Sequence, residues 1–217
     1  MTAALVPPGL AVADIGSDHA YLPVHLVRAG RCPRAIASDI VEGPLENARK
    51  TVLRAKLQDK IELRLSDGFS RCAGLDPAHW CYVLAGMGGT LMARLLDAAP
   101  WLCAPGTILI AQPMRHADDL RAWLISHGFV IEMESACRDA GRPYMALRAM
   151  FNGQLASNNE QLGAGYIHYG ELIHNPDPIA REILAQELKR LEKMVHCSLS
   201  IDHCKKEALD DFRSRYL

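Results

Sequence analysis

Two aspartates flank a glycine in the segment Asp14-Ile-Gly-Ser-Asp18, which directly follows a short apolar run. Asp14 and Asp18 would repel a pyrophosphate, and the segment lacks the second and third glycines of the G-x-G-x-x-G dinucleotide motif. Carboxylates here suit a cationic ligand that carries an amine, because opposite charges attract at short range. The sulfonium and α-amino groups of S-adenosylmethionine (SAM) fit that description. The alternative is that Asp18 only caps a helix.

Three further segments place acids or glycines where later apolar runs end. Asp39 ends the second run, where an acidic residue binds ribose hydroxyls in nucleotide-binding sheets. Asp67-Gly68 ends the third run, where a side chain could meet an adenine amino group. The segment 85–89 ends the fourth, and its three glycines indicate positive φ angles or close approach of a ligand. Solvated acids and tight turns are the alternatives for each segment alone, but together the segments favour one ligand-binding rim.

The elements that would position these residues alternate between strands and helices from Ala11 to about Gly153. Strands are expected at residues 11–15, 34–40, 61–66, 80–85 and 107–112, and helices at 20–29, 44–57, 90–98 and 118–127. Residues 129–136 and 144–151, separated by a turn at 138–143, should form a closing hairpin. The expected fold class is therefore α/β: a Rossmann-like, doubly wound, mostly parallel sheet with an antiparallel edge hairpin.

The chain is expected to continue into a small helical part. Residues 1–153 would form the ligand-binding domain, and residues 154–175, rich in Gly, Asn and Ser, a connector. In residues 176–217 apolar side chains recur at helical spacing, which predicts an antiparallel, coiled-coil-like helical hairpin. Its apolar faces could fold back on the sheet or pair with another copy, so a monomer and a weak dimer both stay open.

Composition narrows the possible partners. Lys plus Arg is 24 against 25 for Asp plus Glu, so any contact with nucleic acid must come from local basic patches. No apolar run approaches the ~20 residues of a membrane span, and we expect a cytoplasmic protein without membrane contact. The seven cysteines are scattered without metal-site spacing, so we expect reduced thiols and no bound metal.

Several of these segments closely resemble the bacterial TrmK family, which uses SAM to methylate N1 of adenine 22 in tRNA. They are Asp14-Ile-Gly-Ser-Asp-His-Ala-Tyr-Leu-Pro23, Val41-Glu-Gly-Pro44, Asp67-Gly68, Ala85-Gly-Met-Gly-Gly89 and Gln112-Pro113. The match spans most of residues 5–150, and the C-terminal helix pair is similar to the helical appendage of that family. The resemblance implies a class I SAM methyltransferase with tRNA as its partner.

The resemblance also implies roles for individual residues at matching positions. The methionine part of SAM would lie against Asp14, Gly16, Ser17, Asp18 and His19. The ribose would lie against Asp39, and the adenine edge against Asp67 and Gly68. The methyl group would lie above Ala85, Gly86, Met87 and Gly88. A carboxylate would stabilise the positive charge that develops on the methylated base. Asp18 is therefore a candidate catalytic residue, together with Tyr21, although Asp18 could instead only bind SAM.

Contact with RNA is expected from basic and aromatic side chains. The basic candidates are Arg115, His116 and Arg121 after the fifth strand, and Lys189, Arg190 and Lys193 on the first C-terminal helix, where a solvated helix face is the alternative. N1 lies on the Watson–Crick edge, so the base must leave its stack before it can react. The candidate stacking partners are Tyr21, Tyr144, Tyr166 and Tyr169, although packing in the core or at an edge is the more common role for each.

The chain departs from the family pattern at both ends. Family members usually carry a helix before the Val-Pro-Pro-Gly segment, whereas Val6-Pro-Pro-Gly9 comes almost at once here, and the C-terminal pair ends at Leu217. We therefore expect a less covered site and a weaker grip on RNA. Two other functions stay open: a SAM- or nucleotide-binding RNA-interaction protein without catalysis, and a nucleotide-dependent oxidoreductase, which the missing glycines disfavour.

Overall fold

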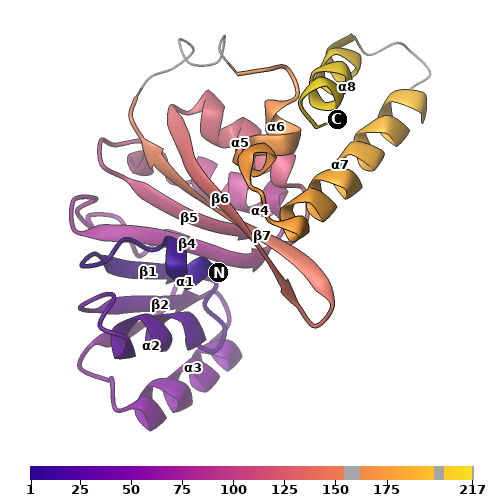
Figure 1. The fold of residues 1–217 in the computed structure, drawn as a ribbon. Helices are drawn as coiled ribbons and strands as arrows, with labels where there is room; N and C mark the ends of the chain where they lie inside the picture. Colours follow the sequence, from indigo (N-terminus) through magenta and orange to yellow (C-terminus); the bar gives the residue numbers. More distant parts are fainter. Residues whose placement is uncertain (154–161, 198–202, 217) are drawn as a thin grey trace.

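The protein folds around one sheet, as a computed structural model that describes residues 1–153, 162–197 and 203–216 shows. The strands are β1 (Ala11–Ile15), β2 (Ala35–Asp39), β3 (Ile61–Leu65), β4 (Trp80–Met87), β5 (Ile108–Pro113), β6 (Phe129–Asp139) and β7 (Arg142–Phe151). They form a 7-stranded sheet in the order β3-β2-β1-β4-β5-β7-β6 (Figure 1). Strands β1 to β5 run parallel, and the β6–β7 hairpin joins β5 antiparallel. The prediction of a Rossmann-like α/β sheet with an antiparallel edge is confirmed.

Helices cover both faces of this sheet. They are α1 (Thr2–Leu5), α2 (Tyr21–Arg28), α3 (Glu42–Ala55), α4 (Gly89–Asp97), α5 (Ala117–Ser126), α6 (Tyr166–Tyr169), α7 (Pro178–Cys197) and α8 (His203–Tyr216), with 3-10 turns η1 (Pro100–Leu102) and η2 (Gly170–His174). Figure 1 shows α2 and α3 beside β2 at one end of the molecule and α7 and α8 near the hairpin at the other. Within the described ranges, no helix is long and apolar enough to cross a membrane.

Alternating side chains of the central strands divide the core into two layers. Ala13 and Ile15 of β1 pack in the layer that α4, α5, α6, α7 and α8 cover. Val12, between them, packs in the layer that α1, α2 and α3 cover. Because side chains of a strand point alternately to opposite faces, a strand buried on both sides is apolar at most of its positions. The apolar residues Ala11 to Ala13 and Ile15 therefore reflect the central position of β1, in which Asp14 is the one polar residue.

The order of the strands in the sheet reverses between β1 and β4. β1 pairs in parallel with β2 on one side and with β4 on the other. Helices that connect neighbouring strands lie on opposite faces on the two sides of such a point, which leaves a crevice at the carboxyl ends of the strands. The loops after β1, β2 and β4 all reach this crevice, so the order of the strands brings the acidic and glycine-rich segments together.

The hairpin is longer than the sequence indicated. Pairing continues to Asp139 and Arg142, so the turn consists of Ala140 and Gly141 and not of residues 138–143. Both turn residues have positive φ, 45° and 80°. A two-residue turn with positive φ at both positions matches the twist of the strands, and hence the ladder can extend to the tip.

The C-terminal helices fold back on the sheet, one of the two arrangements that the sequence left open. α7 and α8 are antiparallel, and the Tyr216 hydroxyl donates to the carbonyl of Arg181 near the start of α7. Leu184 of α7 and Phe212 of α8 belong to the same buried cluster as residues of β1, β4 and β5. Of the expected connector, residues 154–161 lie outside the described residues, and α6 and η2 follow it. All six cysteines whose side chains are described are free thiols, as expected.

A buried ion pair joins this C-terminal part to the sheet. Nε of Arg121 on α5 lies 2.7 Å from Oε1 of Glu134 on β6, and both side chains are almost fully buried, at 3% and 0% exposed. Arg121 also donates to the carbonyls of Ile167 and His168, each at 3.0 Å. Glu134 accepts the N–H of Leu172 at 3.0 Å. The expectation that Arg121 contacts RNA phosphates is therefore wrong, because its guanidinium has no access to solvent.

We predict that Glu134→Gln lowers the free energy of unfolding by about 3 to 5 kcal/mol, because it leaves the Arg121 guanidinium buried without a counter-charge. Urea unfolding followed by circular dichroism would measure the change. The matched control is Glu132→Gln on the same strand, where the ion pair with Arg148 is 29% and 25% exposed. It should cost less than about 1 kcal/mol. Equal losses in the two variants would show that the buried pair has no special role.

Candidate functional site

The loop after β1 lies at the centre of the crevice and is tied to both neighbouring strands. The N–H groups of Gly16 and Ser17 both donate to the carbonyl of Ser38 on β2, at 2.9 and 2.8 Å. Gly16 has φ +72°, and a Cβ there would come within 2.9 Å of Cε of Met87 on β4. Only glycine fits such a position without strain or displacement. The glycine in this motif therefore keeps the loop close to the end of β4.

Asp14 is buried at the base of this loop. Asp14 is only 5% exposed, and the Ser17 hydroxyl donates a hydrogen bond to its Oδ2 at 2.6 Å. Burial raises the pKa of Asp14 to about 6, although the hydrogen bond from Ser17 acts in the opposite direction. A carboxylate with a raised pKa at a strand end is typical of a functional site, because burying a charge without a function is costly.

Asp18 and Asp39 meet although they belong to different strand ends. The backbone N–H of Asp18 donates to Oδ2 of Asp39 at 3.3 Å, and the N–H of Val41 donates to Oδ1 at 3.0 Å. The Asp18 side chain is 63% exposed, with Nε2 of His19 at 3.5 Å. Ala20 is the N-cap of α2, without a side-chain hydrogen bond, so the idea that Asp18 caps this helix is wrong. The two carboxylates thus face one rim.

An exposed aromatic pair lies beside these acids. The rings of His19 and Tyr21 are stacked, with centroids 5.2 Å apart and an interplanar angle of 22°. Tyr21 is 67% exposed, which is unusual for so large a side chain. A ring that is stacked on one side and open on the other offers a surface for a planar ligand.

The end of β4 and the residues that follow it are braced by the end of β5 and the loop after it. The N–H of Gly86 (φ +77°) donates to Oε1 of Gln112 at 3.0 Å, next to an irregularity in the β4–β5 pairing. The N–H of Met114 donates to the carbonyl of Met87, and that of Gly89 to the carbonyl of Arg115, at 2.9 and 2.8 Å. A Cβ on Gly89 would collide with the carbonyl oxygen of His116. The glycines therefore allow close approach of two loops.

Asp67 and Gly68 also lie at this edge of the sheet, after β3. Asp67 is exposed, and Gly68 has φ +52° with a Leu95 side-chain carbon 2.8 Å from where its Cβ would be. Within the described part of the chain, most exposed large apolar side chains lie at the same edge, a signal that the sequence analysis missed. They are Tyr21, Ile40, Val41, Leu65, Leu91 and Met114. Exposed apolar surface of this kind indicates ligand binding.

The basic residues expected to contact RNA have different surroundings. Arg115 is exposed and lies over Gly88, whose Cβ would be 3.7 Å from its Nε. Lys189 and Lys193 are exposed on α7. Arg190 on the same helix instead lies 2.6 Å from carboxylate oxygens of both Glu187 and Asp118, which keep its pKa above the usual value. The Arg190 charge is thus already compensated within the chain.

Two of the four tyrosines considered for stacking are core residues. Tyr166 and Tyr169 are 8% and 1% exposed, and their hydroxyls donate to Glu171 and Asp211. For these two the alternative of core packing holds, whereas Tyr21 and the partly exposed Tyr144 remain accessible.

One cluster has side chains of metal-binding type. Single ligand atoms of Asp118, His168 and Glu187 lie within 4.8 Å of one another, and Nδ1 of His168 is 2.9 Å from Oε1 of Glu187. Arg190 contacts both carboxylates, so the positive charge that a cation would supply is already present. The cluster is best described as an ion-pair network between α5, α6 and α7.

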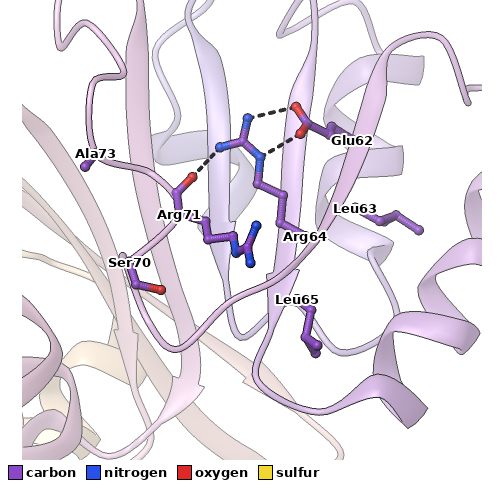
Figure 2. A pocket seen from close by; sticks show the side chains of 7 residues that line it. All are labelled: Glu62, Leu63, Arg64, Leu65, Ser70, Arg71 and Ala73. Carbon is purple, nitrogen blue, oxygen red and sulfur yellow. Dashed lines mark hydrogen bonds and ion pairs between the residues drawn. The ribbon is translucent and has the colours of Figure 1, made fainter.

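A wide cavity of about 740 Å³ lies along the edge strand β3 and the loop that follows it, and Leu65 at the end of β3 is one of its lining residues. Figure 2 shows Arg64 between Glu62 and the main-chain carbonyl of Arg71, with hydrogen bonds to both. None of the residues singled out by the sequence lines it. A second cavity of about 370 Å³ adjoins the loop after β5 and is bounded by the hairpin and α7.

Comparisons with known proteins agree with this geometry. A family model described as a methyltransferase domain matches residues 1–147. The tRNA (adenine(22)-N(1))-methyltransferase of Bacillus subtilis (strain 168) is 35% identical over 144 residues, which are 66% of this chain and 60% of that protein. The chain therefore matches less than two thirds of the length of this curated relative.

Two solved structures extend the likeness to almost the whole chain. A Streptococcus pneumoniae protein in complex with S-adenosyl-L-methionine is 33% identical with a TM-score of 0.80, and the match covers 100% of this chain and 96% of that one. The B. subtilis m1A22 tRNA methyltransferase TrmK is 27% identical with a TM-score of 0.78, covering 99% of this chain and 93% of that one. Both include the C-terminal helices in the matched fold.

We predict that Asp14→Asn stabilises the protein at neutral pH. Folding raises the pKa of Asp14 from its usual 3.8 to about 6, so the folded state binds more protons than the unfolded state between these values. The wild type therefore loses stability relative to the variant as the pH rises from about 4 to 6, by up to about 3 kcal/mol. Urea unfolding at pH 4, 5, 6 and 7.5 would measure the difference. Asp59→Asn, at an exposed position, is the control, and a pH-independent gain in Asp14→Asn would contradict the prediction.

Proposed function

The chain belongs to the methyltransferase-domain family, and we propose that it transfers a methyl group from SAM to N1 of adenine 22 in tRNA. The observation that carries the proposal is the contact between the loop after β1 and the end of β2, where the Asp18 N–H binds Asp39. This contact unites two acidic segments at the point where ligands bind in such sheets. The names of the relatives support the choice of tRNA and of the acceptor atom.

The residues at the rim suit the separate parts of SAM. The carboxylate of Asp39 uses one hydrogen bond on each oxygen within the chain, which leaves lone pairs for the two hydroxyls of a ribose. Ile40 and Val41, 62% and 54% exposed, provide an apolar surface beside it for adenine, and Asp67 is exposed at the next strand end. Asp14 and Asp18 contribute the negative charge that favours the sulfonium and amino groups. Bound SAM supplies the methyl group.

We assign the reacting base to the exposed side of the same loop. Adenine N1 carries its own lone pair, so the enzyme chiefly has to hold the base in line with the methyl group. The open face of Tyr21 can stack on the base, and the exposed carboxylate of Asp18 can stabilise the cationic product. In this assignment Asp18 and Tyr21 are the catalytic residues, and Gly86 to Gly88 form the floor beneath the methyl group.

The rest of the proposal concerns partners and surroundings. Lys189, Lys193 and Arg115 are the proposed contacts to tRNA phosphates, and Arg190 holds α7 in place. We propose a monomer, because the apolar sides of α7 and α8 pack within the chain. A tRNA substrate would place the enzyme in the cytoplasm. The reaction requires no metal ion, since the nucleophile is an uncharged ring nitrogen with a free lone pair.

The reaction itself is tested by incubating the protein with isotopically labelled SAM and unmodified bacterial tRNA, followed by digestion and mass spectrometry of the nucleosides. We expect labelled N1-methyladenosine, and we expect Asp18→Ala to lower kcat/KM by about a hundredfold or more, because it removes a charge next to the developing cation. Asp59→Ala, an exposed acid at the opposite end of the sheet, should keep full activity.

Each result of this experiment has a definite meaning. SAM binding without any methylated nucleoside would favour a binding protein over an enzyme. A failure to bind SAM, with binding of a nicotinamide dinucleotide instead, would favour the oxidoreductase. Full activity of Asp18→Ala would remove Asp18 from catalysis while leaving the reaction in place.

We predict that Asp39→Ala weakens SAM binding by about ten- to a hundredfold, because it removes the charged acceptor proposed for the ribose hydroxyls. Isothermal titration with SAM and with S-adenosylhomocysteine would measure both affinities. They should fall together, since the ribose is common to both ligands. Glu46→Ala, an exposed acid on α3, is the control. An unchanged affinity in Asp39→Ala would place the ribose elsewhere.

A further inference from the structure

The second cavity, of about 370 Å³, lies between the loop after β5, the hairpin and α7. Its walls include Arg115 and His116 from the loop, Tyr144 from the hairpin, and Ile183 and Gln186 from α7. The volume falls within the range of about 300 to 1,000 Å³ that is typical of pockets for small organic groups.

The cavity shares a wall with the proposed methyl-transfer site. Arg115 lines the cavity and also lies over Gly88, whose Cβ would be 3.7 Å from its Nε. The backbone of the same loop is hydrogen-bonded to Met87 and Gly89. A group bound in the cavity would therefore lie directly beside the segment that faces the acceptor adenine.

The cavity is lined by both apolar and polar side chains, and of the latter Arg121, His168, Glu187 and Arg190 already have partners within the chain. Ile183, Leu184 and Leu172 contribute aliphatic surface, and Tyr144 contributes a ring. Glu187 and Arg190, which also line it, are hydrogen-bonded to each other. Arg115, in contrast, has no carboxylate partner among the described residues and is exposed. Aliphatic and aromatic surface beside an exposed guanidinium matches a planar base that carries a phosphate.

The surroundings favour a nucleotide of a polymer over a free one. Gln186, Lys189 and Lys193 are spaced by three and four residues and are exposed, so they form one face of α7 that begins at the cavity. Removing the acceptor base from its stack leaves its neighbours without a stacking partner. An RNA strand that leaves the rim along the basic face of α7 would pass the opening of the cavity.

We infer that this cavity binds the base of a second tRNA nucleotide, adjacent to the acceptor adenine, and that Arg115 binds the phosphate between the two. The inference rests on the proposed function for its choice of tRNA. In this arrangement the α7 side of the cavity determines how the substrate RNA is positioned, while SAM binds independently on the other side of the Gly86 to Gly88 segment.

The test compares two tryptophan variants on neighbouring positions of α7. Gln186→Trp would fill the cavity opening, whereas Ala185→Trp adds the same side chain at an exposed position that does not line it. Equilibrium binding of unmodified tRNA, measured with S-adenosylhomocysteine present, should be about tenfold weaker in Gln186→Trp, as for loss of one stacked base, and within about twofold of wild type in Ala185→Trp. SAM affinity should be unchanged in both variants.

A second measurement does not depend on the bulky side chain. Arg115→Gln should reduce the slope of the tRNA affinity against salt concentration by about one phosphate contact. Equal tRNA affinities in Gln186→Trp and Ala185→Trp, or an unchanged salt slope in Arg115→Gln, would overturn the inference even if the wild type methylates tRNA. If the wild type binds tRNA with the expected differences but forms no methylated product, the nucleotide site stands and the proposed reaction fails. If the wild type neither binds nor methylates tRNA, both fail.

Discussion

The buried pair of Arg121 and Glu134 is the interaction on which the C-terminal half of the structure depends. A guanidinium in the protein interior must have every donor satisfied, and here the partners are one carboxylate and the carbonyls of Ile167 and His168. Since Glu134 also accepts the N–H of Leu172, the pair fixes α5, β6 and the segment α6–η2 as one unit. The segment that leads into α7 is therefore fixed relative to the hairpin.

A second set of ion pairs extends this unit towards the rim. Arg190 on α7 binds Asp118 at the start of α5, and Glu187 binds both Arg190 and His168. These groups are partly buried, so their attraction is less screened than it would be on an open surface. The result is that α7 lies along one wall of the cavity next to the loop after β5. The exposed lysines Lys189 and Lys193 of α7 are thus positioned by these ion pairs.

The sequence was most informative where function depends on the ends of strands, because apolar periodicity locates those ends and the parallel topology brings them together. Asp14, Asp39 and the glycines after β4 were found in this way. The sequence could not predict whether a particular arginine side chain is buried or exposed. Arg121 and Arg115 both follow β5, yet only Arg115 reaches solvent. That difference depends on Glu134, which comes from another strand and becomes a partner only through tertiary packing.

The loop after β1 and the strand end before it contain several features that lower the stability of the folded protein. Asp14 keeps a carboxylate in a buried place, and Asp18 and Ala20 have positive φ angles of 51° and 56°, which side chains disfavour. Residues with such conformations persist only when neighbouring structure holds the loop, and here the Ser38 carbonyl accepts the N–H groups of Gly16 and Ser17 while Asp39 accepts that of Asp18. Because both partners come from β2, the strand that supplies the proposed ribose ligand also maintains the strained loop. In the proposed function, cofactor binding and loop geometry therefore depend on the same strand end.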